Sequence, residues 1–138
     1  MILIDTNVFL ELALDQEKAA DCATFLSRVS DGSIEATVTH FTIHAVEASL
    51  RSGKHLTEFL RNIESSEGLR VSGTSVSEEA SIAVLAEKMG KGFDDALQYF
   101  VAKKIGSTAI VSFDTHFDGL DLPRLTPKEA LKRSSRTQ

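Results

Sequence analysis

The chain has 138 residues, of which 42% are hydrophobic and 25% are charged, and these proportions suit one globular domain with a hydrophobic core. Its single cysteine excludes an internal disulfide, and no stretch approaches the roughly 20 apolar residues of a membrane span. We therefore expect a single domain over residues 1–133, a loose polar tail over residues 134–138, and a cytoplasmic protein.

The pattern of apolar residues predicts strands that alternate with helices. In chain order these are a strand at 1–4, helices at 7–14 and 17–30, a strand at 34–38, helices at about 40–51 and around 56–63, a strand at 69–72, helices between Ser75 and Gly90 and at 93–105, strands at 108–112 and 122–125, and a short helix from Thr126. Pro123 lacks the N–H that a central strand needs, so the last strand should lie at a sheet edge.

This alternation predicts an α/β fold with a mostly parallel central sheet of about five strands flanked by helices. Ligands of such sheets bind at the carboxyl ends of the strands. Functional side chains are therefore sought just after the strands.

Two aspartates come just after predicted strands. Asp5 comes after the first strand, and Asp114 comes two residues after Ser112, which ends the strand at 108–112. Each has a purely structural alternative, because Asp5 could cap the next helix and Asp114 could form an Asx-turn. Since the carboxyl ends of parallel strands share one edge of the sheet, we expect the two side chains to lie close together.

Two further carboxylates occur on predicted helices. Glu47 falls within the apolar stripe of Ile43, Val46 and Leu50, where an unpaired charge is costly unless it binds a cation or pairs with Arg51 at i+4. Asp94 and Asp95 open the helix at 93–105, where one of them, more plausibly Asp94, serves the helix dipole.

Four clustered carboxylates repel one another unless cations intervene, and oxygen-only ligands select hard ions such as Mg²⁺ or Mn²⁺. The formal net charge of -5 argues against a nucleic-acid binder, because phosphate contacts usually come from a basic face. Divalent ions would cancel much of that charge and meet the phosphate themselves.

Four segments, in order and spacing, resemble the PIN-domain family: LIDTNVFLE, VEASL, FDDALQYFVAKKIG and AIVSFDTHFD. The length is similar to that of VapC-like toxins of toxin–antitoxin pairs. The resemblance implies a three-layer α/β/α fold and a Mg²⁺- or Mn²⁺-dependent endoribonuclease that hydrolyses RNA phosphodiester bonds. It also implies an RNA substrate, an antitoxin partner and a homodimer.

Carried over residue by residue, the resemblance assigns the catalytic and metal-binding roles to Asp5, Glu47, Asp95 and Asp114. It gives Thr6, Asn7 and Ser112 supporting roles. Asp118 is either a further supporting acid or an ordinary loop residue, and His116 has no family role.

Two other functions stay open from the sequence. A haloacid-dehalogenase-like phosphatase also places an aspartate after its first strand, but its second acid in D-x-D spacing is replaced here by Asn7. The other is a PIN-fold RNA-processing or binding protein without a toxin role, in which cleavage is absent or incidental.

Overall fold

The computed structural model describes residues 1–137, and the side chains of residues 1–134. It contains a five-stranded, all-parallel sheet in the order β3-β2-β1-β4-β5, which confirms the predicted α/β class. The strands are β1 (Ile2–Ile4), β2 (Ala36–Thr39), β3 (Leu69–Ser72), β4 (Ile110–Val111) and β5 (Arg124–Leu125). As Pro123 predicts, β5 is an edge strand.

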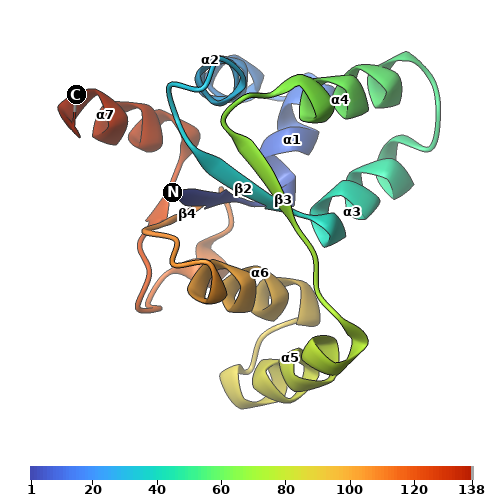
Figure 1. Cartoon of the computed structure of the whole chain (residues 1–138), viewed down its shortest axis with the longest axis vertical. Coiled ribbons are helices and arrows are strands. Elements are labelled where there is room, and N and C mark those ends of the chain that lie inside the picture. The colour runs from blue at the N-terminus through green and yellow to red at the C-terminus, as the bar shows by residue number, and fades with distance from the viewer. Residues whose placement is uncertain (138) are drawn as a thin grey trace.

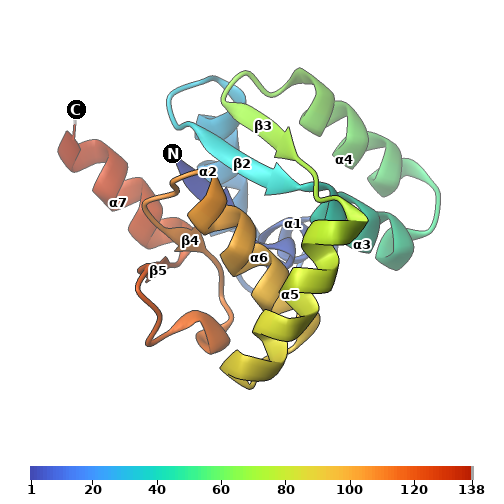
Figure 2. The ribbon, with the colours of Figure 1, turned by 60° about the horizontal axis from the view of Figure 1, so that its bottom comes forward.

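Seven α-helices and one 3-10 helix complete the described part of the chain. They are α1 (Thr6–Ala13), α2 (Ala19–Ser30), α3 (His40–Leu50), α4 (Lys54–Ser65), α5 (Val76–Met89), α6 (Phe93–Lys104), the 3-10 helix η1 (Thr115–Phe117) and α7 (Pro127–Thr137). Helices α5 and α6 cover one face of the sheet, and α1, α2 and α4 cover the other (Figure 1, Figure 2).

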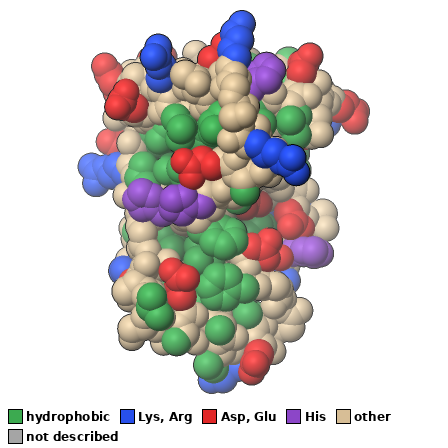
Figure 3. Space-filling view, turned by 90° about the vertical axis from the view of Figure 1, so that its right-hand side faces the viewer, with side chains coloured by type: hydrophobic (Ala, Val, Ile, Leu, Met, Phe, Trp, Pro, Cys, Tyr) green, Lys and Arg blue, Asp and Glu red, His purple; other side chains and the backbone are tan. Residues whose placement is uncertain are grey.

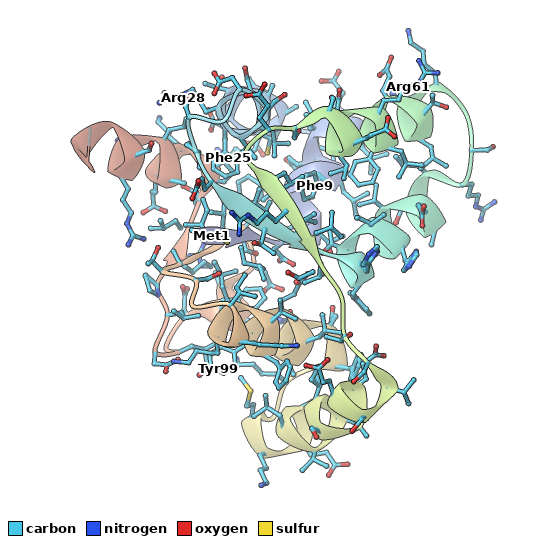
Figure 4. All side chains as sticks on the ribbon, viewed as in Figure 1. Met1, Phe9, Phe25, Arg28, Arg61 and Tyr99 are labelled. Carbon is cyan, nitrogen blue, oxygen red and sulfur yellow. The ribbon has the colours of Figure 1, made fainter. Side chains whose placement is uncertain are left out.

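Alternation along the central strands produces the two halves of the core. Leu3 and Ile110 pack in the cluster on the α5–α6 side, whereas Ile4 and Val111 pack in the cluster with α1 and α2. Successive side chains of a strand point to opposite faces, so both faces of β1 and β4 are buried. Figure 4 shows Phe9 and Phe25 on the second of these faces, between the sheet and the helices above it.

Local capping signals set several helix ends as the sequence predicts. Ser75 and Glu78 form a reciprocal capping box at the start of α5, and Gly90 ends that helix in the left-handed conformation, with φ 65°. Thr126 and Glu129 form the same reciprocal pair of hydrogen bonds at the start of α7.

The C-terminal helix is longer than we predicted. Helix α7 continues to Thr137, into the segment that we expected to be a loose polar tail, while Gln138 lies outside the described residues. The helix lies against α2 with Ala130 buried, and tertiary packing of this kind stabilises helices whose own sequences are too polar to indicate them. Among the described residues, no helix is long and apolar enough to cross a membrane.

Cys22 is fully buried in α2, as its helical spacing predicts. Burial, with the nearby charges of Glu11 and Asp21, raises the pKa of its thiol to about 12. Because the thiolate is the reactive form, we expect the folded protein to resist a thiol reagent at pH 8 and to be modified quantitatively in denaturant. Mass spectrometry after a timed incubation measures this, and rapid labelling of the folded chain would contradict the burial of Cys22.

Candidate metal centre

Strands β1 and β4 lie side by side where the winding of the sheet reverses. The chain winds outward from β1 through β2 to β3 and then continues on the other side with β4 and β5, so its winding reverses between the adjacent strands β1 and β4. A ligand site is expected beyond the carboxyl ends of strands at such a point. Figure 3 looks onto this end of the sheet, where acidic and histidine side chains flank a hydrophobic strip.

Asp5 and Asp114 both lie at this edge. Asp5 follows β1 and caps α1, with its carboxylate accepting a 2.8 Å hydrogen bond from the Thr6 N–H. Asp114 follows β4 and caps η1 by accepting a hydrogen bond from the His116 N–H. The capping roles that the sequence offered as alternatives are thus present together with the placement at one edge.

Ser112 joins the two strand ends. Its fully buried hydroxyl donates to Asp5 Oδ2 at 2.7 Å and accepts from the Asp114 N–H at 2.9 Å and from Asn7 Nδ2 at 3.2 Å. The Asn7 side chain also accepts from the Phe113 N–H. Ser112 and Asn7 are thus hydrogen-bonded to Asp5 or to the chain that leads to Asp114.

Gln98 is a site residue that our sequence analysis missed. It is buried on α6, and its amide Nε2 donates to Asp5 Oδ1 at 3.3 Å and to Thr42 Oγ1 at 2.7 Å. Thr39 donates to its Oε1, and Thr42 also contacts the Thr6 hydroxyl. The available signal was its place three residues after Asp95, on the same side of the helix.

Asp95 completes the acidic group from the first turn of α6. One oxygen of Asp95, one of Asp114 and a ring nitrogen of His116 all lie within 4.8 Å of one another. Asp5 is outside this closest group, and its oxygens accept hydrogen bonds from Thr6, Ser112 and Gln98.

The electrostatics of Asp5 and Asp95 suit a cation. Burial raises the pKa of Asp5, and the charges of Asp95 and Asp114 raise it further against the opposing hydrogen bonds from Ser112 and Thr6. The pKa of Asp95 is raised by burial and then by the charges of Asp94 and Asp114. Carboxylates in this state are disfavoured as free anions, and a bound divalent ion removes that penalty.

Glu47 is not brought into this group. Its carboxylate is 37% exposed and lies 2.8 Å from His44 Nδ1, and no described hydrogen bond or ion pair joins it to the aspartates. Glu47 follows Thr42 by five residues, which turns it about 140° around α3 from the side that contacts Gln98. The alternative side-chain pair with Arg51 does not form either; only the Arg51 N–H contacts the Glu47 carbonyl.

The other two acids near the site lie outside it. Asp118 forms a 2.8 Å ion pair with Arg124. Asp94 is exposed in the first turn of α6, where a negative charge suits the helix dipole. Neither carboxylate belongs to the close group of Asp95, Asp114 and His116.

Comparison with known proteins decides the family. The sequence model of the PIN-domain family matches residues 2–122 of this chain. The chain belongs to the PIN-domain family. PIN domains are nucleases, so this membership favours the nuclease over the haloacid-dehalogenase-like phosphatase.

Two solved PIN-like structures share the fold. VapC20 from Mycobacterium tuberculosis, a toxin that cleaves the sarcin–ricin loop, is 18% identical with a TM-score of 0.66, over 83% of this chain and 90% of that one. PAE2754 from Pyrobaculum aerophilum is 17% identical with a TM-score of 0.64, over 98% and 96%. No curated protein matches the sequence.

Proposed function

We propose that this PIN domain is a Mg²⁺- or Mn²⁺-dependent endoribonuclease that hydrolyses phosphodiester bonds of RNA. The observation that carries the proposal is the convergence of Asp5, Asp95 and Asp114, from three separate segments, at the point where the sheet winding reverses. The donor set fits a hard divalent ion, because carboxylate oxygens predominate and the aspartates carry a negative net charge.

Some of these residues would hold the metal ion, and others would position the carboxylates. Asp95 and Asp114 would hold the ion directly, and Asp5 would add its negative charge from a carboxylate fixed by Ser112 and Gln98. A bound ion supplies a Lewis acid for the scissile phosphate and lowers the pKa of water. Ser112 and Asn7 would keep the carboxylates in place through their hydrogen bonds.

The toxin role belongs to the same proposal. The structural likeness to VapC20 supports a VapC-like toxin whose antitoxin covers the three aspartates. From the family resemblance we also propose that the chain forms a homodimer. A neighbouring reading frame for a small DNA-binding protein, and its co-purification with this chain, would support that pairing. The alternative without a toxin role predicts neither.

The test is an RNA cleavage assay on structured RNA with Mg²⁺, with Mn²⁺ and with EDTA. We expect cleavage with either ion and none in EDTA, with recovery when the ion is returned in excess. Binding of RNA without cleavage under every metal condition would favour the binding-protein alternative and contradict the nuclease.

The family resemblance also assigns Glu47 to the ion, and its exposed position predicts a graded result. We expect Glu47→Gln to lower the cleavage rate less than Asp95→Asn does, because Glu47 contacts His44 and none of the aspartates. Single-turnover rates and Mn²⁺ affinities of the two variants measure the difference. Equal losses would mean that Glu47 reaches the ion when substrate is bound, and would restore the four-carboxylate assignment.

A further inference from the structure

His116 is the one nitrogen donor in the acidic group. Its Nδ1 lies 3.1 Å from Asp95 Oδ2 and 3.2 Å from Asp114 Oδ1. Two ligands at right angles on an ion about 2.1 Å away stand roughly 3.0 Å apart. Both contacts match that spacing, and the first is also a hydrogen bond in this structure.

The backbone holds this histidine in place. The His116 N–H donates to Asp114 Oδ1 at 2.9 Å, and its carbonyl accepts from Lys91 Nζ at 2.5 Å. The next residue, Phe117, is buried at 1% exposure and anchors the turn in the core. The side chain is 69% exposed and therefore open to solvent. Its backbone and its contacts with the two carboxylates set its position.

We propose that His116 is a third protein ligand of the ion held by Asp95 and Asp114, and that its imidazole makes the site prefer first-row transition ions over Mg²⁺. This inference rests on the proposed function. An imidazole nitrogen is a good ligand for transition ions, whereas Mg²⁺ favours oxygen. Transition ions also gain affinity along the Irving–Williams order at a site with a nitrogen donor.

The geometry also permits an opposite role, in which a protonated His116 serves only as a counter-ion for the two carboxylates. The two roles predict opposite signs. Removing a ligand weakens the binding of a transition ion. Removing a counter-ion that competes for the same oxygens leaves that binding unchanged or strengthens it.

The experiment measures Co²⁺ and Mg²⁺ binding to the full chain by calorimetry, together with the visible absorption of bound Co²⁺, which reports its ligands. The variants are His116→Ala and the matched control His44→Ala, because His44 is also an exposed histidine against a carboxylate but contacts Glu47. We expect His116→Ala to weaken Co²⁺ binding by at least about tenfold. Losing a residue that only hydrogen-bonds to a metal ligand already costs about tenfold, and losing a ligand itself should cost no less. Mg²⁺ affinity should fall by a smaller factor, and the Co²⁺ spectrum should change.

Equal Co²⁺ affinity and an unchanged spectrum in His116→Ala would overturn the inference, as would an equal loss in His44→Ala. If the wild-type chain still cleaves RNA with Mg²⁺ in that case, the proposed nuclease stands and only the role of His116 fails. If no divalent ion binds the wild-type chain, the proposed function and the inference fail together. Melting temperatures of both variants show that each one is folded.

Discussion

Asp95→Asn should abolish metal-dependent RNA cleavage and, in the same protein, raise the melting temperature of the metal-free chain at pH 7. The loss of activity follows because an amide offers the ion one neutral oxygen in place of a carboxylate at the centre of the group. The gain in stability follows from the raised pKa of Asp95, which marks a charge that the folded state disfavours.

The direction with pH follows from that raised pKa. A carboxyl whose pKa is higher in the folded than in the unfolded chain stabilises the fold while both states are protonated, and this contribution is lost as pH rises through the folded value. Near pH 7 the ionised Asp95 therefore lowers the free energy of unfolding, and asparagine has no such charge. A bound ion reverses the sign for the wild-type chain, so Mn²⁺ should raise its melting temperature and leave that of Asp95→Asn nearly unchanged.

Thermal unfolding with and without Mn²⁺, from pH 4 to pH 8, measures both effects beside the cleavage assay. The matched control is Asp94→Asn, which removes the same charge one residue earlier from an exposed side chain. We expect that control to keep its activity and its response to Mn²⁺. Undiminished cleavage by Asp95→Asn would refute the assignment of the site.

Ser112→Ala should weaken Mn²⁺ binding by about 10–100-fold, the usual effect of losing a residue that orients metal ligands. It should also lower the free energy of unfolding, because the substitution leaves three buried or half-buried partners without their hydrogen bond. Each unsatisfied partner costs about 1–3 kcal/mol. Losing the Ser112 hydroxyl also removes a hydrogen bond that lowers the pKa of Asp5, so that pKa should rise further.

The matched control is Ser107→Ala. Ser107 is also buried, but its hydroxyl has no hydrogen-bond partner among the described residues. Removing an unsatisfied buried hydroxyl should leave the free energy of unfolding unchanged or raise it, without changing Mn²⁺ affinity. Urea unfolding and calorimetry compare the two variants, and equal effects of both substitutions would show that Ser112 has no specific role.

Much of the fold and part of the site follow from local sequence. The period of the apolar residues and the caps at Ser75 and Thr126 predicted the order of strands and helices. Asp5 and Asp114 were placed at one edge because each comes shortly after a strand of a parallel sheet, and the carboxyl ends of such strands share one edge. Asp95 was separated from Asp94 by its position beside the apolar stripe of α6.

What only the tertiary structure decided depends on how elements rotate and dock against one another. The sequence put Glu47 on an apolar stripe, but which side of α3 faces the aspartates is set by the hydrogen bond between Thr42 and Gln98. The place of His116 depends on a turn whose last residue, Phe117, is buried in the core on the α5–α6 side of the sheet, and α7 packs against α2, which is far from it in the sequence. Periodicity fixes which residues share a face, while the orientation of that face is a property of contacts between segments far apart in the chain.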